Sequence, residues 1–414
     1  MSRSSNTLLV GYYGKKNLGD DALLLASAWA NQHILNNQQL TCTASDVIDL
    51  PGFKQQKPTL AAEQKFSGHN RLLQYKLAWQ SEQVILGGGS VLHSAHDLNI
   101  KRLMLKLSSK HSSNAVPEKQ HMAVGVGIEG FSDHKAKQAC QHFLNECPFV
   151  GLRDEQSYQR AKQLAPKANI ARTFDLAPAL LCHPALIADK KQRDNHLSLS
   201  GSEQQQRSGI AINLCSVPTD SLGNINQAAE QQRVLQYANL ICKLLDTTEQ
   251  QITLISLNAE PMLNNNRLND DSLLEKVKDC VAAKTAAPFL MNRLHLLKYQ
   301  PDPIHLIRTL SSFQVVIAMR LHAAILSYII NTPVIAINYH HKCSSWCAQI
   351  GLPMRYRMSA DNADTDKLYG TIIAGLKYGF KPPLLPVKSA LQQSLKNWRL
   401  TDEQIEYFCD HSAL

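Results

Sequence analysis

The chain of 414 residues lacks long apolar runs. No uninterrupted stretch approaches the roughly 20 apolar residues that a helix needs to cross a bilayer. The first residues, MSRSSNTLLVGYYG, also lack the apolar core of a signal peptide, because their apolar part leads directly into a glycine loop. We therefore expect a cytoplasmic protein, and the sequence leaves open a location at the inner face of the membrane.

Aromatic residues and clustered basic residues are both scarce. Aromatic side chains make up 6% of the chain, and the Lys and Arg residues form no long run although the formal net charge is +9. Modules that bind nucleic acids usually gather basic charge on one face or beside stacking aromatics, so we expect no nucleic-acid partner. The positive charge favours small anionic substrates, and it also suits a peripheral contact with an anionic membrane.

The ten cysteines lack a paired spacing, which together with the missing export signal predicts reduced thiols. One stretch, HHKCSSWC, brings His340, His341, Cys343 and Cys347 close together and raises the question of zinc. No second cluster with ligand spacing completes a four-ligand site, and two cysteines one helical turn apart can simply pack. We therefore expect no metal.

Apolar strand patterns alternate with helix patterns along most of the chain, which is typical of parallel sheets with helices on both faces. This predicts an α/β fold with two Rossmann-like, doubly wound domains that face each other across a cleft. Residues 189–208 are polar and poor in large apolar side chains. We therefore expect an N-terminal domain over 1–188, a linker or loop over 189–208, a C-terminal domain over 209–385, and a helical segment over 386–414 that packs back across the domain boundary.

The first candidate corner is GYYGKKNLGDDA, residues 11–22. Ligands of open parallel sheets bind where strands end and helices begin, and the glycines here allow tight turns. The spacing does not match the dinucleotide fingerprint G-x-G-x-x-G. Asp20 and Asp21 fall at the N-cap or first turn of the next helix, where capping competes with a binding role. Asn17 and one of these aspartates are candidates for binding sugar hydroxyls.

Two further corners follow apolar strands. In LGGGS, three consecutive glycines require the backbone to pass close to a ligand or to a neighbouring strand. Gly88, Gly89 and Ser90 could hold an anion or a hydroxyl there. In GLRDE, Arg153 ends a strand and Asp154 opens a helix. Arg153 either pairs with a carboxylate to hold the corner or binds an anion, and the sequence leaves both open.

The segment AMRLHAA places Arg320 and His322 directly after an apolar strand. Arginine suits bidentate contact with phosphate or carboxylate, and histidine can move a proton near neutral pH. One strand later, YHHK adds His341 and Lys342. Two adjacent corners with these cationic groups predict an anion pocket.

At these residues the sequence resembles the polysaccharide pyruvyl transferase family. The series GYYGKKNLGDDA, GGGS, RDE, an Asp175 with Pro178 nearby, RLHA, PVIAINYHHK and GLP appears in order between residues 7 and about 355. The resemblance implies a GT-B-like fold and transfer of the enolpyruvyl or pyruvate group from phosphoenolpyruvate to a sugar of a cell-surface polysaccharide or its precursor. It implies a pyruvate ketal as product, released phosphate, and no cofactor beyond this co-substrate.

The resemblance maps the family's Arg, His and Lys onto Arg320, His322 and Lys342. Together with the corners described above, it leads us to expect the acceptor on the N-terminal domain and phosphoenolpyruvate on the C-terminal domain. His322 is the expected proton donor, and Asp20 or Asp21 the expected base. The residues expected to bind phosphoenolpyruvate are Arg320, Lys342, Arg153 and His341. The residues expected to bind the acceptor are Asn17, Gly88, Gly89 and Ser90.

Two departures from the family pattern bear on the acceptor or on the pocket charge. The N-terminal loop commonly reads Gly-Asp-Glu where this chain has Gly19-Asp20-Asp21, and Asp-Pro commonly stands where it has His340-His341. The chief alternative is a GT-B glycosyltransferase that uses a nucleotide sugar, and a third class is a non-catalytic assembly protein. Whether the saccharide is lipid-linked, and the oligomeric state, cannot be read from the sequence.

Overall fold

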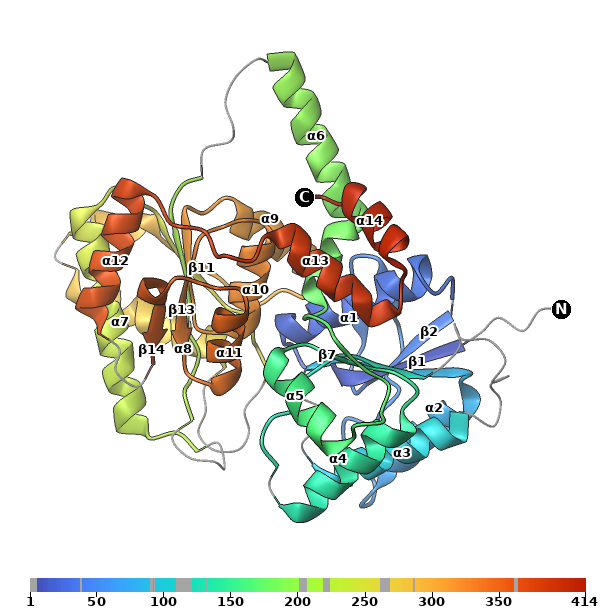
Figure 1. The fold of residues 1–414 in the computed structure, drawn as a ribbon. Coiled ribbons are helices and arrows are strands. Elements are labelled where there is room, and N and C mark those ends of the chain that lie inside the picture. Colours follow the sequence, from blue (N-terminus) through green and yellow to red (C-terminus); the bar gives the residue numbers. More distant parts are fainter. Residues whose placement is uncertain are drawn as a thin grey trace. The chain divides into compact units, whose positions relative to one another are not determined.

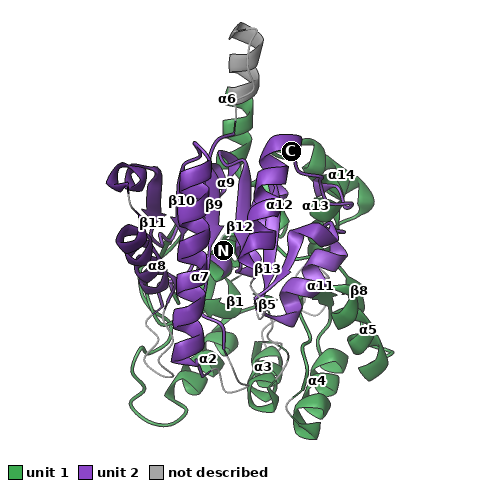
Figure 2. Ribbon diagram, turned by 90° about the vertical axis from the view of Figure 1, so that its left-hand side faces the viewer, with its two compact units in different colours: residues 1–15, 20–192, 388–414 green, residues 16–19, 193–387 purple. Residues whose placement is uncertain are grey.

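We analysed a computed structural model of the chain, which describes residues 6–414 except 38, 90, 91, 93, 109–120, 132, 201–206, 219–223, 261–268, 286 and 361–363, with backbone alone for 193–200. Two compact units are present (Figure 2). Unit 1 comprises Met1–Lys15, Asp20–Gln192 and Lys388–Leu414, and unit 2 comprises Lys16–Gly19 and Arg193–Val387. Each unit is organised around its own sheet.

The main sheet of unit 1 has six parallel strands in the order β2-β1-β5-β6-β7-β8. Their bounds are Gln39–Ala44 for β2, Asn6–Tyr13 for β1, Gln83–Gly89 for β5, Met122–Val126 for β6, Val150–Leu152 for β7 and Ile170–Arg172 for β8. A short antiparallel hairpin, β3 Ile48–Leu50 with β4 Phe53–Gln55, follows β2. The central strands are buried along almost their whole length, because helices cover both faces.

The helices of unit 1 form two groups. Helix α1, Leu18–His33, connects β1 to β2. The helices that pack in series on one another are α2 His69–Gln80, α3 Ala95–Ser108, α4 His134–Glu146 and α5 Glu155–Leu164. The remaining helices are η2 Ala177–Cys182, α6 Pro184–Ser200, α13 Val387–Leu395, η5 Lys396–Trp398 and α14 Asp402–Asp410. The C-terminal segment of unit 1 thus follows the residues of unit 2 in the sequence.

One fully buried side chain, Asn397 in η5, ties this returning segment to the sheet of unit 1. Its Oδ1 accepts hydrogen bonds from the Gly125 amide at 2.7 Å and from the Thr173 hydroxyl at 2.9 Å. Its Nδ2 donates to the carbonyls of Phe174 and Ser394, each at 2.9 Å. All four bonds lie in the core, so the last residues belong structurally to the first unit.

The sheet of unit 2 also has six parallel strands, in the order β11-β10-β9-β12-β13-β14. Their bounds are Leu294–Leu297 for β11, Ile252–Ile255 for β10, Ile210–Asn213 for β9, Val315–Ala318 for β12, Val334–Asn338 for β13 and Arg357–Ser359 for β14. The order reverses between β9 and β12, which is the topological switch point of a Rossmann sheet. Ligands of such sheets bind outside the carboxyl ends of the strands at this point.

The helices of unit 2 cover the sheet on two sides (Figure 1). One group packs together and consists of α7 Gln227–Thr247, α8 Asp270–Lys284 and α12 Thr365–Tyr378. The others are α9 Pro303–Ser311, α10 Leu321–Ile329 and α11 His341–Gln349, with the short turns η3 Pro288–Arg293 and η4 Met354–Tyr356. Asp302 caps α9 and Pro303 occupies its first turn, where the missing amide of proline is not needed.

One expectation from the sequence needs correction. Helix α6 runs through Ser200, so the expected loop over 189–208 is wrong for its first part, and residues 201–206 lie outside the described chain. The physical reason is that the residues after Pro184 contain no glycine or further proline before Ser200, and polarity alone does not oppose a helix. Helix α1 begins at Leu18, so Asp20 and Asp21 lie in its first turn, which is one of the two positions considered for them.

Candidate functional site

The centre of the site in unit 2 is Asn213, the last residue of β9. Its side chain is buried, donates from Nδ2 to the Ile255 carbonyl at 2.9 Å, and accepts from the Arg320 amide at 2.9 Å. The Asn213 carbonyl also accepts from the Met319 amide at 3.1 Å. One asparagine therefore joins the ends of β10, β9 and β12 and holds the start of α10 in place.

Arg320 forms a bidentate ion pair with Asp270. Its Nε and Nη2 donate to Oδ2 and Oδ1 of the carboxylate, both at 2.6 Å. Asp270 is fully buried at the start of α8, and its Oδ2 also accepts from the Leu257 amide at 3.1 Å. Burial lowers the pKa of the Arg320 guanidinium, but Asp270, with smaller contributions from Cys215 and Tyr339, raises it, and the net shift is upward. Arg320 is therefore a fixed, permanently charged group.

This pairing changes the interpretation of Arg320. The sequence suggests a guanidinium wholly available to a ligand, whereas two of its three nitrogens donate to Asp270. Arg320 is also the N-cap residue of α10, and its side chain contacts Asp270 instead of capping that helix. By contrast, the aspartate and asparagine N-caps of α5, α8 and α9 accept from their own helix amides. The first amides of α10 therefore receive no side-chain cap from Arg320.

The glycine loop of the N-terminus belongs to unit 2 over Lys16–Gly19. The Leu18 amide donates to the Leu257 carbonyl at 2.9 Å, and the Ala259 amide donates to the Lys16 carbonyl at 2.9 Å. This pairing brings Gly19 against His322, since a Cβ at Gly19 would overlap the imidazole Nδ1. The structure thus brings together two candidate corners that lie about 300 residues apart in the sequence.

Asn17 has a structural task in this loop. Its Oδ1 accepts from the Gly19 amide at 3.2 Å, so Asn17 and not an aspartate caps the first turn of α1. Asn17 also forms an isolated bridge with Asn258. A role of Asn17 in binding an acceptor sugar stays a prediction.

The neighbouring corner, at the end of β13, carries His341 and Lys342. Strand β13 pairs with β12 in parallel, so both corners lie at the carboxyl edge of one sheet. His340 caps α11 by accepting from the Lys342 amide at 3.3 Å, His341 is exposed, and Lys342 is half-buried. Cys343 and Cys347 face the interior, and the Cys347 thiol donates to Asn338 Oδ1 at 3.6 Å. Among the described residues, no group of three or more His, Cys, Asp or Glu side chains could hold a metal ion.

The glycine corner of unit 1 is explained in part by packing. The Tyr13 hydroxyl, on β1, donates to the Gly87 carbonyl at 3.4 Å, and a Cβ at Gly87 would overlap this phenol. A Cβ at Gly88 would lie 2.7 Å from Leu23, and Gly89 has a φ of 91°, which other residues rarely adopt. The neighbouring strand β1 therefore accounts for Gly87, and packing against helix α1 accounts for Gly88. Ser90 lies outside the described residues.

Asp20 and Asp21 lie in the first turn of α1. Asp21 is buried, whereas Asp20 is half-buried. Burial, and then the negative charges of Asp97 and Asp20, raise the pKa of the Tyr12 phenol. These carboxylates and the exposed Tyr12 ring thus mark the carboxyl edge of β1, which is the switch point of the sheet in unit 1.

Arg153 occupies the end of β7 in unit 1 and is buried. Its guanidinium lies 3.7 Å from Asp154 and 3.9 Å from Glu129, and Gly127 leaves the space in which it lies. Asp154 caps α5 by accepting from the Ser157 amide at 2.8 Å. The carboxylates favour the structural alternative for Arg153, while anion binding by this residue stays a prediction.

Sequence reasoning missed Asn213 and Asp270. The signal for Asn213 was a polar residue that ends the apolar run IAIN, and the signal for Asp270 was the Asn-Asp-Asp start of an apolar helix. Both signals also fit ordinary strand ends and helix caps. Only the contacts of Asn213 and Asp270 with Arg320 distinguish these two residues from ordinary structural ones.

Comparison with known proteins agrees with this architecture. A sequence model described as polysaccharide pyruvyl transferase matches residues 17–341. The structure is similar to UDP-GlcNAc 2-epimerase from Methanocaldococcus jannaschii, with a TM-score of 0.54, 10% identity, and coverage of 93% of this chain and 97% of that one. It is also similar to a putative UDP-N-acetylglucosamine 2-epimerase from Listeria monocytogenes, with a TM-score of 0.54, 10% identity, and coverage of 97% and 98%.

At these identities the likeness shows the fold alone. The fold-class prediction is confirmed, because the chain is α/β with two parallel-sheet, Rossmann-like units of the GT-B kind. No helix among the described residues is long and apolar enough to cross a membrane.

Proposed function

Since the chain belongs to the polysaccharide pyruvyl transferase family, we propose that it transfers the enolpyruvyl group of phosphoenolpyruvate to a sugar and closes it to a pyruvate ketal. The observation that carries this proposal is the fixed Arg320 next to His322 at the switch point of unit 2. The acceptor would be a saccharide of a cell-surface polysaccharide or its precursor, whether lipid-linked or soluble.

The donor would bind at the carboxyl edge of the unit 2 sheet. Phosphoenolpyruvate carries a phosphate and a carboxylate, which suit the remaining guanidinium nitrogen of Arg320, the ammonium of Lys342 and the first amides of α10. Because the Asp270 carboxylate neutralises the charge of Arg320, the ammonium of Lys342 becomes the main positive charge available to bind the donor. We assign to His341 and Arg153 weaker, additional contacts with phosphoenolpyruvate.

His322 would supply the proton. Protonation of the methylene carbon of phosphoenolpyruvate makes its neighbouring carbon an oxocarbenium-like centre, which one sugar hydroxyl attacks. Loss of phosphate and attack by a second hydroxyl then close the ketal, so one donor and one diol give one ketal and one phosphate. Asp20 or Asp21 would accept the hydroxyl protons, and Asn17, Gly88, Gly89 and Ser90 would contact the acceptor.

The test measures phosphate release from phosphoenolpyruvate in the presence of candidate glycans, followed by mass spectrometry of the product. We expect His322→Gln to lower the rate at least about a hundredfold, which is the usual size of a general acid effect. Arg320→Lys keeps the charge but has a single nitrogen, which cannot both pair with Asp270 in the bidentate manner and replace the remaining guanidinium nitrogen toward the donor. It should raise the donor concentration needed for half-maximal rate.

The matched control is His305→Gln, since His305 is an exposed histidine on α9 of the same unit. If His322→Gln and His305→Gln both release phosphate at the wild-type rate, the site is assigned wrongly. If the wild-type protein releases no phosphate with any glycan and yields no ketal, the reaction itself is wrong.

A second candidate is a transferase that uses a nucleotide sugar. The observation in its favour is the structural likeness to proteins described as UDP-GlcNAc 2-epimerases, whose name contains a nucleotide sugar. The two functions separate in a thermal-shift titration. Stabilisation by phosphoenolpyruvate and not by UDP-GlcNAc supports the pyruvyl transfer, and the reverse supports the second candidate.

A further inference from the structure

The most exposed large apolar side chains of the described chain gather in two segments of unit 2. Met354 is 74% exposed, Tyr378 77% and Leu384 79%, and the other large apolar side chains of the described residues are less exposed. Met354 lies in the turn after α11, while Tyr378 and Leu384 lie in and after the end of α12. Exposed apolar side chains gathered on one face of a soluble protein usually mark a binding surface.

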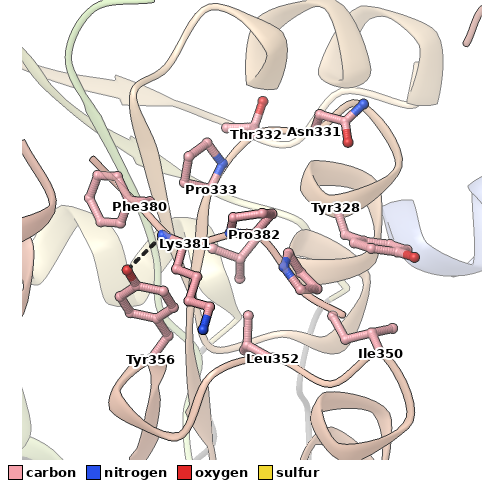
Figure 3. Close-up of a pocket in the computed structure, with 12 residues that line it drawn as sticks. Tyr328, Asn331, Thr332, Pro333, Ile350, Leu352, Tyr356, Phe380, Lys381 and Pro382 are labelled. Carbon is pink, nitrogen blue, oxygen red and sulfur yellow. Dashed lines mark hydrogen bonds between the residues drawn. The ribbon is translucent and has the colours of Figure 1, made fainter. Parts of the chain in front are cut away.

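Direct contacts hold the two segments side by side. The Lys381 amide donates to the Tyr356 hydroxyl at 3.0 Å, as Figure 3 shows, and the Tyr356 and Phe380 rings lie 5.9 Å apart. The Leu384 amide donates to the Gly351 carbonyl at 3.3 Å. Residues 351–357 and 377–386 therefore form one surface, which we call the β14-edge face.

The β14-edge face is cationic. Residues 351–357 and 377–386 contain four Lys or Arg residues and no Asp or Glu. The exposed cations are Arg355, Lys377 and Lys381. Arg355 lies 4.7 Å above the Tyr356 ring, and Lys377 Nζ lies 5.1 Å above the Tyr378 ring, so cations and apolar groups share the same surface.

The backbone donors of residues 381–386 need no water. Among these six described residues, Pro382, Pro383 and Pro386 have no amide hydrogen. The other three amides donate within the protein, from Lys381 to the Tyr356 hydroxyl, from Leu384 to the Gly351 carbonyl and from Leu385 to the Ile350 carbonyl. Every backbone donor of this stretch is therefore satisfied without water, and the Leu385 carbonyl accepts from the Tyr328 hydroxyl at 2.8 Å. Fewer unmade donor bonds lower the cost of bringing this stretch into an apolar medium.

Beside this stretch lies a largely apolar hollow of about 110 Å³ (Figure 3). Its wall includes Tyr328, Pro333, Phe380 and Pro382. Pro333 precedes β13, so the hollow lies at the amino edge of the sheet, opposite the edge with Arg320 and His322. A partner that covers the β14-edge face leaves the carboxyl edge accessible.

From these observations we propose that the β14-edge face docks on the surface of an anionic lipid bilayer. Met354, Leu384 and the proline stretch enter the region between headgroups and acyl chains, and Tyr378 lies at the interface as an amphipathic ring. Arg355, Lys377 and Lys381 contact anionic headgroups. The charge pattern and the satisfied backbone favour this occupant over a second copy of the chain.

The test is co-sedimentation with vesicles of equal parts phosphatidylglycerol and phosphatidylcholine, compared with vesicles of phosphatidylcholine alone. The wild-type protein should sediment with the first and not with the second. Lys377→Gln with Lys381→Gln should lower the partition coefficient about twenty-five-fold, because each cation near an anionic surface contributes about fivefold. Met354→Ser with Leu384→Ser should lower it at least about tenfold.

The controls lie near β11, the outermost strand at the other end of the strand order from β14. Phe289→Ser removes a side chain that is 69% exposed, and Lys276→Gln with Lys284→Gln removes two exposed cations of α8. These controls should bind vesicles like the wild type, and urea unfolding checks that every variant is folded. Because vesicle binding needs no substrate, its result is independent of the proposed reaction.

Three outcomes would overturn the proposal. The first is wild-type protein that binds neither vesicle, or both equally. The second is an equal loss of vesicle binding in the β14-edge variants and in the control variants, which would show that binding depends on the overall surface charge and not on this face. The third is unchanged vesicle binding in the β14-edge variants while light scattering shows that they dissociate an oligomer, which would make this face a contact between copies.

Discussion

At the scale of single residues, Gly19 determines where His322 can lie. Gly19 is buried in the first turn of α1, and a side chain there would occupy the place of the imidazole. The residue is a glycine although the helical position would favour alanine by up to about 1 kcal/mol. The need for space beside His322 therefore determines the residue at position 19 more strongly than helix propensity does.

For Gly19→Ala, we expect unfolding free energy within about 1 kcal/mol of wild type, because the propensity gain offsets part of the clash. The rate of phosphate release should fall at least about tenfold, because the methyl group displaces His322. Gly130→Ala is the control, since no atom lies within 4 Å of a Cβ at that position. Wild-type activity of Gly19→Ala would refute the placement of His322 as proton donor.

The buried Asp270 is the second residue on which the site depends. For Asp270→Ala we expect a loss of about 3–5 kcal/mol in unfolding free energy, because Arg320 would keep its charge without the partner. Glu275→Ala on the same helix removes an exposed ion pair with Lys298 and should cost less than about 1 kcal/mol. Urea denaturation measures both, and equal losses would show that the Arg320 pair contributes no more than a surface pair.

At the scale of elements, a buried histidine joins two central strands of unit 1. His121 precedes β6, and its Nδ1 accepts from the Val84 amide of β5 at 3.1 Å. Burial lowers the pKa of His121 to about 4 from an ordinary value of 6.5. The folded state thus binds the proton less readily than the unfolded chain does.

The contribution of His121 to the unfolding free energy should therefore be fully present above about pH 6.5. It should fall as the pH drops towards about 4, because the unfolded state binds more protons than the folded state in this window. Between pH 7 and pH 5 the His121 contribution is about 2 kcal/mol. His121→Asn keeps an acceptor for the Val84 amide but does not titrate, so it should flatten this part of the profile. The exposed His305→Asn should leave the profile as it is, and a His121→Asn profile as steep as that of wild type would contradict the assignment.

At the scale of the whole molecule, the chain returns to unit 1 at its end, and Asn397 carries much of this connection. Asn397→Ala would leave the Gly125 amide and two buried carbonyls without this partner, while the Thr173 hydroxyl could still donate to the Leu152 carbonyl. This should cost about 3 kcal/mol in unfolding free energy. The neighbouring Lys396 is exposed, and Lys396→Ala should change stability by less than about 0.5 kcal/mol. Limited proteolysis should then release the C-terminal helices from Asn397→Ala and not from Lys396→Ala.

The sequence by itself determined the α/β class, because the apolar strand pattern and its alternation with helices are short-range signals. It also placed Arg320 and His322 at the carboxyl end of a buried strand, since that position depends only on where the apolar run VVIAM ends. The ordered series of motifs predicted the family to which the chain belongs.

Only the tertiary structure decided which of these residues meet. Asp270 reaches Arg320 because β12 lies beside β9, and β9 beside β10, an order that no local pattern encodes. Gly19 reaches His322 because the loop over Lys16–Gly19 pairs with residues that follow β10. The physical reason is that secondary structure follows from neighbours in sequence, whereas a site at a sheet edge follows from strand order, which the packing of the whole unit selects.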